Sequence, residues 1–307
     1  MLRTKRIGEW FQILVPHEWA GKSIDEIFHK VWEASKKLTY QFRVEHKVLV
    51  DGSRINWNSA LPLGAKLQLH LFEDEQVQTI PNFFDLEILY EDDHILVINK
   101  PPFMNTHPND PTKDTDSLIN AAAYYLLSKG EMRNIRQIHR LDRDTSGAIL
   151  FAKHALAGGI LDKMLEKREV KRTYIAAVHG IFQQKSGSIN KPIGRDRHHA
   201  TRRRVSASGQ EAITHYQLLK VDTKKKLSYV KCWLDTGRTH QIRVHLSHLG
   251  HPLVGDTLYG GMPVVNRQAL HAVKLEFFHP FIQEVVVCHA PFMDLPELFN
   301  HIDVYSI

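Results

Sequence analysis

The chain has 307 residues, of which 43% are hydrophobic and 24% charged, so its composition is that of a folded globular protein rather than a disordered or fibrous one. Its length suits two domains, and no apolar run approaches the roughly 18 residues of a membrane-spanning helix. A formal net charge of +6 favours nucleic acid as a partner.

The N-terminus and the two cysteines indicate a cytoplasmic protein. Residues 1–6 are basic but lead into Ile7 to Trp10 rather than into the apolar core of a signal peptide. Cys232 and Cys288 lie far apart, each in a strand-like segment, as buried small hydrophobes do in a reducing compartment. We therefore expect no disulfide framework, no membrane association and a cytoplasmic location.

A first, small α+β unit is predicted for residues 1–78. Apolar residues recur at helical spacing within 23–34, which predicts an amphipathic helix. A hairpin is predicted over 47–56 because an Asp-Gly turn signal separates two short segments, and the alternating leucines of 67–71 indicate a half-buried strand. The polar residues 73–82 are expected to form a linker.

The second predicted unit, residues 79–307, is rich in strands. Helices are expected at 117–127, capped by Asp116, at 155–167, and from about Thr239. The pattern lacks a βαβ rhythm, so we predict an α+β fold with a mixed, mostly antiparallel sheet flanked by helices. The predicted strands are 95–99, 148–153, 173–178, 212–221, 227–234, 274–277 and 284–288.

The most informative segment is residues 139–147, which read His-Arg-Leu-Asp-Arg-Asp-Thr-Ser-Gly. Apolar chain flanks it, with Ile138 before and the predicted strand 148–153 after. A solvated run of charges does not normally lead into a buried strand. The pattern therefore predicts a polar loop feeding a core strand, which is a common place for reactive groups.

This segment resembles the signature of RluA-type pseudouridine synthases, which convert uridine in RNA to its carbon-linked isomer. Further blocks in matching order extend the resemblance over residues 85–295, and the elements predicted for 1–78 resemble the αL-type RNA-binding module that precedes many such domains. A small packing domain that touches no RNA is the alternative for that module. The matching blocks are Tyr90–Pro101, His107-Pro108, Val170–Tyr174, Pro192–Arg195, Thr236–His245, Gly250–Pro252, Gly255–Gly260 and Leu270–Ala272.

The resemblance implies three catalytic residues and no cofactor. Asp142 corresponds to the carboxylate that attacks the sugar or takes a sugar proton, either of which requires it to be ionised. Arg243 corresponds to the arginine that pairs with it, and Arg238 is a weaker candidate. Tyr174 corresponds to the aromatic that packs against the base and acts in late proton removal, although its spacing alone favours a core tyrosine.

Other residues of the segment are assigned by chemistry and by the same resemblance. Asp144 is expected to face away from Asp142 or to bond loop amides. The hydroxyls of Thr145 and Ser146 are expected to shape the loop through local hydrogen bonds. In the family the arginine corresponding to Arg140 fills the gap left by a flipped-out base; a buried, salt-bridged arginine is the alternative.

A basic cluster between positions 167 and 204 can neutralise several phosphates, or else forms a solvated basic face. Within the family, Arg172 stands where lysine is more usual. The residues predicted to bind RNA are His139, Arg140, Arg172, Arg195, Arg202, Arg203, Arg204 and Arg238.

Two rival functions follow from the same residues. A non-catalytic RNA-binding or ribosome-assembly protein would need only the basic surface. A metal-dependent hydrolase would use the histidines between 240 and 251, but these lack a nearby cysteine or carboxylate at ligand spacing, so no metal is expected. The favoured prediction is a monomeric, cofactor-free RNA pseudouridine synthase that isomerises specific uridines in structured RNA. Ribosomal RNA is slightly favoured over tRNA as its substrate.

Overall fold

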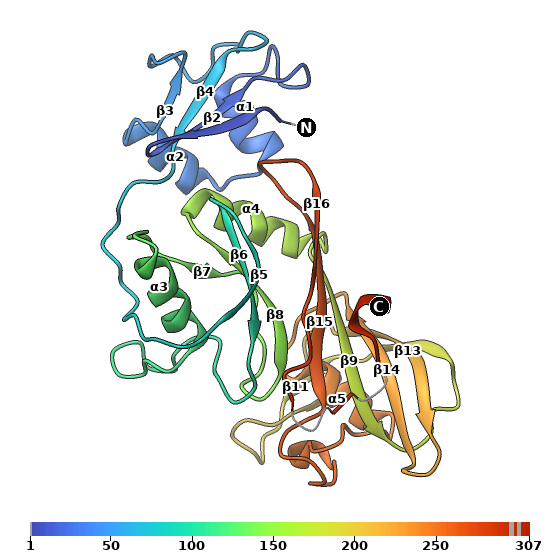
Figure 1. Cartoon of the computed structure of the whole chain (residues 1–307). Coiled ribbons are helices and arrows are strands. Elements are labelled where there is room, and N and C mark those ends of the chain that lie inside the picture. The colour runs from blue at the N-terminus through green and yellow to red at the C-terminus, as the bar shows by residue number, and fades with distance from the viewer. Residues whose placement is uncertain (1, 295–297, 300–301) are drawn as a thin grey trace.

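A computed structural model describes residues 2–294, 298–299 and 302–307 of the chain. It contains a four-stranded sheet in the N-terminal part, a large sheet built from the rest of the chain, and a two-stranded ribbon. Figure 1 shows the small sheet at one end of the molecule and the ribbon strand β11 at the other. No helix of the described residues is long and apolar enough to cross a membrane.

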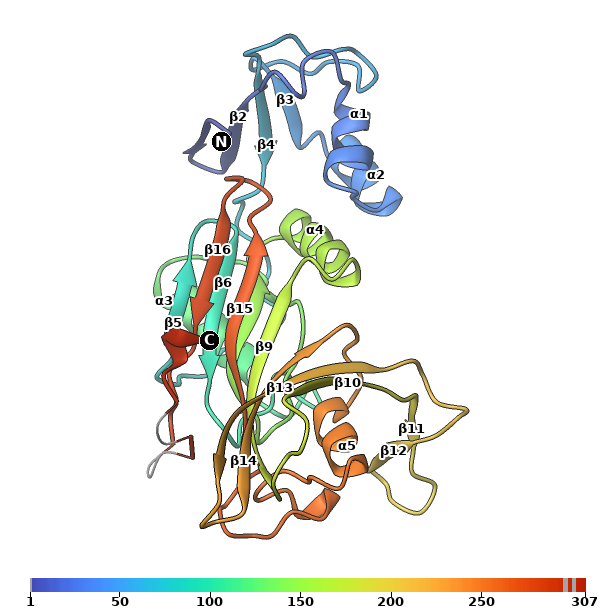
Figure 2. The ribbon, with the colours of Figure 1, turned by 90° about the vertical axis from the view of Figure 1, so that its right-hand side faces the viewer.

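The N-terminal sheet is antiparallel, in the order β1-β2-β4-β3, and its helical segments pack on one face (Figure 2). Its strands are β1 (Thr4–Ile7), β2 (Trp10–Leu14), β3 (Val48–Val50) and β4 (Lys66–His70). The helical segments are α1 (Ile24–Glu26), the π-helical η1 (Ile27–Val31) and α2 (Lys36–Val44).

Two details of this unit differ from the sequence-based expectation. The predicted hairpin partner of β3, residues 53–56, forms only a single bridge, and β3 pairs with β4 instead. Asp51 accounts for the change, because its side chain accepts a hydrogen bond from the backbone N–H of Lys66 at 3.0 Å. The strands β1 and β2 and the helix α2, which begins after the N-cap Ser35, were not predicted.

The large sheet runs in the order β10-β13-β14-β9-β15-β8-β6-β5, with β16 beside β15 and β7 beside β8. Among its described strand pairs only β15 and β8 are parallel, so the predicted mixed, mostly antiparallel α+β fold is confirmed. Its strands are β5 (Glu87–Glu91), β6 (Ile95–Lys100), β7 (Arg136–Gln137), β8 (Ser146–Ala152), β9 (Lys171–His179), β10 (Ser186–Asn190), β13 (Ile213–Asp222), β14 (Leu227–Leu234), β15 (Leu270–Phe278) and β16 (Val285–His289).

Helices cover this sheet, and a short antiparallel ribbon lies beside it. The N-cap of α3 is Ser117 rather than the predicted Asp116, because the backbone N–H of Ser117 bonds the side chain of Asn120, three residues on. The cysteines of β14 and β16 are buried and unpaired, as expected. The elements are α3 (Leu118–Ser128), α4 (Ala155–Glu166), α5 (Gln241–His248), the 3-10 turns η2 (Thr257–Tyr259) and η3 (Val304–Ser306), and the ribbon strands β11 (Ile193–Arg195) and β12 (Arg203–Val205).

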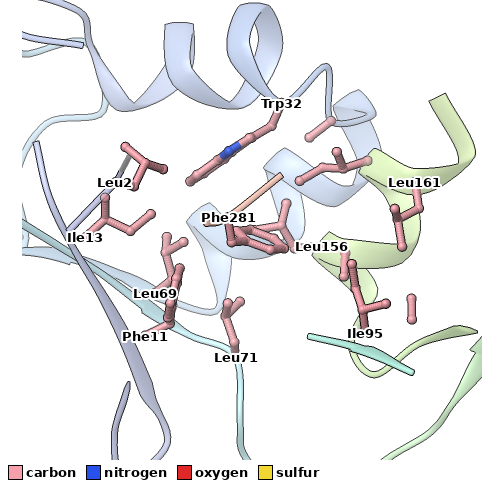
Figure 3. Close-up of a cluster of buried hydrophobic side chains, with 14 of the residues drawn as sticks. Leu2, Phe11, Ile13, Trp32, Leu69, Leu71, Ile95, Leu156, Leu161 and Phe281 are labelled. Atoms are coloured by element: carbon pink, nitrogen blue, oxygen red, sulfur yellow. The ribbon is translucent and has the colours of Figure 1, made fainter. Parts of the chain in front are cut away.

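A single buried apolar cluster joins the N-terminal sheet to the large sheet (Figure 3). Phe281, at the turn between β15 and β16, is fully buried there, and its ring lies 5.6 Å from that of Phe11 on β2. Leu69 of β4 and Leu156 of α4 belong to the same cluster. The two parts of the chain therefore share a core, and the predicted division at residue 78 stays a prediction.

Candidate active site

A cavity of about 760 Å³ lies between the loop that precedes β8 and the start of α5. Residues 137–142 form one wall and residues 234–243 the other, and the side chains of Tyr174 and Arg172 on β9 line it between them. The predicted reactive segment and the predicted partner segment thus face the same space. Its volume suits one nucleoside.

The loop at 139–145 is held from below by buried polar groups. The hydroxyl of Thr106 donates to the carbonyl of Leu141 at 3.0 Å and accepts from its N–H at 3.2 Å. The ammonium of Lys100, fully buried at the end of β6, donates to the carbonyl of Arg143 at 2.9 Å. These bonds fix the backbone on both sides of Asp142, as the predicted polar loop before a core strand requires.

The entry into β8 depends on a close approach of two backbones. Gly147 has φ +117°, and a Cβ there would lie 2.3 Å from the carbonyl oxygen of Ala272 on β15. Only glycine fits this position. The hydroxyls of Thr145 and Ser146 bond the distant side chains of Gln268 and His271, so the expectation of local hydrogen bonds was wrong.

Asp142 and Arg243 meet in the cavity although 101 residues separate them. The Nη1 of Arg243 donates to Oδ2 of Asp142 at 2.9 Å, and the Asp142 side chain is 25% exposed. The other nitrogens of the guanidinium, Nε and Nη2, donate to both oxygens of Asp256 at 2.7 and 2.9 Å. Burial lowers the pKa of Arg243, but the two carboxylates outweigh it and raise that pKa.

Gln241, at the first position of α5, explains why Arg243 points into the cavity. Its amide oxygen accepts from the hydroxyl of Thr236 and from the N–H of Arg238, and its amide nitrogen donates to the carbonyl of Ile213 on β13. The preceding His240 has φ +59°, which turns the chain sharply into the helix. The helix start is therefore fixed to the sheet.

Tyr174 lies on β9 opposite Cys232 of β14, with 4% of its surface exposed. Burial raises the pKa of its phenol, and the negative charge of Asp142 raises it further. Arg172 lies two residues earlier and lines the same cavity. Tyr174 is thus a buried tyrosine of the sheet and also part of the cavity wall. Its packing against a base stays a prediction.

Besides Arg172, three of the predicted RNA-binding residues lie at the cavity, each in a different way. Arg140 is exposed, and its Nη2 donates to the hydroxyl of Thr239 at 2.9 Å. Arg238 is exposed, and its Nε donates to the carbonyl of Glu211. His139 is buried beneath the loop, where its Nε2 accepts from the N–H of Leu150, and burial lowers its pKa to about 3. His139 therefore fixes the loop as a neutral group.

Among the described residues, the carboxylate of Asp144 contacts neither Arg243 nor the amides of the loop. The only side-chain contact of its carboxylate there is with the neighbouring Arg143, at 3.3 Å. Its backbone carbonyl accepts from the buried guanidinium of Arg267 at 3.0 Å. The expectation that Asp144 bonds loop amides was wrong. The absence of a contact with Arg243 agrees with the other expectation, that Asp144 faces away from Asp142.

The remaining basic residues lie on and beside the ribbon β11–β12, outside the cavity. Arg195 and Arg204 are exposed, whereas Arg202 pairs with Asp196 at 2.7 Å. The backbone N–H of Arg203 donates to the hydroxyl of Tyr259 at 2.9 Å, which attaches the ribbon beside α5. Figure 2 shows the ribbon next to that helix.

Several residues of the site were not predicted as functional. Asp256 and Tyr259 stand in the matching block 255–260, and Lys100 in the block 90–101, so their signal was the family match alone. Tyr259 lies under the guanidinium of Arg243, 5.0 Å from ring centroid to Cζ. The Nε2 of His240 lies 3.8 Å from Oδ2 of Asp142.

Two of the histidines considered as metal ligands, His245 and His251, have other partners. His245 bonds the hydroxyl of Thr214 and the carbonyl of Lys191, and His251 bonds the carbonyl of His179. Within the described ranges, no group of three or more His, Cys, Asp or Glu side chains is arranged to hold a metal ion.

Two family models match the chain. One, described as RNA pseudouridylate synthase, matches residues 94–248, and the other, described as RluD ribosomal pseudouridine synthase N-terminal domain, matches residues 11–67. The first match includes the whole loop with Asp142 and extends through Arg243. The resemblance predicted from the sequence is confirmed.

Individual relatives agree with these matches. An uncharacterized RNA pseudouridine synthase of Bacillus subtilis, YhcT, is 46% identical over 93% of this chain and 94% of the relative. The ribosomal large subunit pseudouridine synthase D of Pseudomonas aeruginosa is 36% identical over 87% of each chain. Among solved structures, human RNA pseudouridylate synthase domain containing 1 is 29% identical with a TM-score of 0.57, over 67% of this chain and 83% of that chain.

Proposed function

The chain belongs to the RNA pseudouridylate synthase family, and we propose on that basis that it isomerises uridines in structured RNA, with Asp142 as the reactive carboxylate. The observation that carries this assignment is the geometry of Asp142. Arg243 holds one of its oxygens at 2.9 Å beside Tyr174, in a cavity that suits one nucleoside. This geometry supports Asp142 as the reactive group.

The reaction breaks the bond between the sugar and the base nitrogen, turns the base and joins the same sugar carbon to a base carbon. Asp142 either attacks the sugar carbon or removes a neighbouring sugar proton, and both routes start from the ionised carboxylate. Arg243 holds this carboxylate by a hydrogen bond from Nη1 to Oδ2. Because the product is an isomer of the substrate, no oxidant or group donor is consumed, and we propose that no cofactor takes part.

Tyr174 is assigned to the base. Its ring forms part of the cavity wall, where an aromatic face can stack on any pyrimidine. Burial raises its pKa, so the phenol is neutral at pH 7, which supports the packing role better than that of a base in proton removal. Arg140, exposed at the rim, is proposed to stabilise the RNA from which the uridine has been extruded.

The proposed RNA-binding surface extends from the rim of the cavity to the β11–β12 ribbon. We leave His139 out of it because this residue is buried and neutral. The charged groups of this surface can pair with phosphates without reading sequence. They are Arg140, Arg172, Arg195, Arg202, Arg203, Arg204 and Arg238.

Large-subunit ribosomal RNA is the proposed substrate, because relatives such as the enzyme of Pseudomonas aeruginosa are named for it and residues 11–67 match the N-terminal domain of that type. We propose that residues 1–78 bind this RNA and that residues 79–307 hold the catalytic site. Transfer RNA is the alternative substrate. The protein is proposed to act as a monomer in the cytoplasm, where ribosomes are made.

Release of tritium from RNA that carries uridine labelled at ring carbon 5 tests the function directly. We expect the purified protein to release tritium from ribosomal RNA in the presence of a chelator, and Asp142→Ala to release none while it binds the RNA as tightly as wild type. Binding without release by the wild-type protein would identify a non-catalytic RNA-binding protein. Release that stops on addition of the chelator would indicate a metal-dependent enzyme.

A further inference from the structure

Asp256 is a buried carboxylate that the proposed chemistry does not use. Only 1% of its side chain is exposed, and both of its oxygens accept from the guanidinium of Arg243. Burying a carboxylate costs free energy unless a charged partner meets it with good geometry. The buried position of Asp256 therefore calls for an explanation in terms of its effect on Arg243.

The backbone around Asp256 is built to hold it in place. Gly255 has φ +78°, and a Cβ there would lie 2.0 Å from the carbonyl oxygen of Arg267. The N–H of Asp256 donates to the carbonyl of Leu253 at 3.1 Å, and its own carbonyl accepts from Gly261 at 2.8 Å. The carboxylate is thus fixed by a tight turn before it meets the guanidinium.

We propose that Asp256 is a positioning residue, which orients Arg243 so that the guanidinium holds only one oxygen of Asp142. A guanidinium is planar and tends to bind a carboxylate through two parallel hydrogen bonds. Here Asp256 occupies Nε and Nη2, which leaves Nη1 for Oδ2 of Asp142. Among the described residues, Oδ1 of Asp142 has no hydrogen-bond partner, so this oxygen is available to the sugar.

Asp256 also adds a second negative charge next to the guanidinium. In the low-dielectric interior this charge offsets part of the attraction of Arg243 for Asp142. The carboxylate of Asp142 is then held by a guanidinium that it shares with Asp256. This inference rests on the proposed function, because it assigns to Asp256 the support of the same reactive group.

Tyr259 also holds the guanidinium of Arg243 in place. Its ring lies under the guanidinium at 5.0 Å, and its hydroxyl bonds Nδ1 of His240 at 2.8 Å and accepts from the N–H of Arg203 at 2.9 Å. The guanidinium is therefore fixed at its edge by Asp256 and at its face by Tyr259. This leaves little freedom for Arg243 to turn toward both oxygens of Asp142.

The test compares Asp256→Asn with wild type in single-turnover tritium release at saturating RNA, with RNA affinity measured separately. An amide keeps one acceptor oxygen but presents an N–H donor in place of the other and carries no charge, so the paired hydrogen bonds and the ion pair are lost at almost unchanged volume. We expect the rate to fall about 100-fold, as for a misplacement of reacting groups by about 1 Å, with the dissociation constant for RNA within about twofold. A crystal structure of this variant should show Arg243 on both oxygens of Asp142.

Asp92→Asn is the matched control, because Asp92 is another partly buried carboxylate that pairs with the histidine of a neighbouring segment, His279 at 2.7 Å, and does not line the cavity. This variant should keep the wild-type rate. If Asp256→Asn fails to fold, Asp256→Glu keeps the charge but displaces the guanidinium, and its rate should also fall.

Two sets of outcomes separate the inference from the proposed function. A wild-type rate in the Asp256 variants, or a loss confined to RNA affinity, overturns the positioning role while Asp142→Ala stays inactive. Absence of tritium release by the wild-type protein, or full activity of Asp142→Ala, overturns the proposed function itself.

Discussion

The Nζ of Lys100 lies 2.9 Å from the carbonyl oxygen of Arg143 and joins the end of β6 to the loop that carries Asp142. The same ammonium donates to the carbonyls of Pro101 and Met104, each at 2.8 Å. Burial lowers the pKa of Lys100 to about 7, and the neighbouring Arg267 lowers it as well. One buried lysine side chain thus replaces water as the partner of three carbonyls behind the site.

Lys100→Met should lower both stability and rate. The substitution leaves three buried or partly buried carbonyls without this partner, for which we expect a loss of about 2–5 kcal/mol in the free energy of unfolding. Because one of them belongs to Arg143, the loop at Asp142 loses a support, and the single-turnover rate should fall about tenfold or more. Urea unfolding and tritium release measure the two effects.

Lys153→Met is the control for that experiment. Lys153 is equally buried, with 1% of its side chain exposed, but its ammonium pairs with Glu91 and Glu131 away from the cavity. It should lose stability and keep its rate at a temperature where it is folded. Equal loss of rate in both lysine variants would show that Lys100 supports the fold in general rather than the loop.

Arg243→Lys tests the geometry at Asp142. A lysine keeps one positive charge but replaces the planar fork with a point charge on a flexible stem, so it cannot bond Asp256 through two atoms and Asp142 through a third. We expect the rate at saturating RNA to fall about 100-fold, or about 2.7 kcal/mol in the activation barrier. Arg243→Lys with the wild-type rate would mean that only the charge matters.

The ribbon is the part of the proposed RNA surface that can be altered without touching the cavity. Arg195 and Arg204 are exposed on β11 and β12. Removing both with Arg195→Ala and Arg204→Ala should weaken RNA binding and reduce the slope of log K against log salt by about 0.7–0.9 for each phosphate that the protein no longer neutralises. The rate at saturating RNA should change far less than the affinity.

The control for the ribbon is the turn between β13 and β14, where Lys224 and Lys225 are exposed. This turn lies at the end of β14 opposite to Leu234, which lines the cavity. The double variant Lys224→Ala and Lys225→Ala removes the same charge and should leave the salt dependence unchanged. A salt slope that falls equally in both double variants would argue for a diffuse charge effect.

The sequence indicated which segments meet at the cavity better than it predicted the N-terminal sheet. Segments such as 227–234 matched the structure residue for residue, because long apolar alternation and chemical motifs are both local signals. The strand β3 was assigned to the wrong partner, because a turn signal does not say which distant strand is adjacent. Asp256 was missed for the same reason. Its proposed role depends on contact with Arg243, and only the fold brings the two residues within 3 Å of each other.

Acid should destabilise the junction between the two sheets. His94 is buried there, stacked on Phe281 at 4.3 Å, and its Nδ1 bonds His154 at 2.9 Å. Burial lowers the pKa of His94 to about 3 and places that of His154 well below its ordinary value. Both imidazoles are therefore neutral in the folded protein at pH 5, whereas in the unfolded chain they are protonated.

The sign follows from this difference in bound protons. A folded-state pKa below the unfolded value of 6.5 gives stability that is fully present above pH 6.5 and is lost as the pH falls toward 3. At pH 5 the loss from His94 alone is about 2 kcal/mol relative to pH 7. Urea unfolding at the two pH values measures it, and His94→Gln should shrink the difference by that amount although it is less stable at pH 7.

Phe281→Leu loses packing in the same cluster without losing a titrating group, so its stability should drop equally at both pH values. If His94→Gln retains the full wild-type difference between pH 7 and pH 5, the acid sensitivity arises elsewhere in the protein.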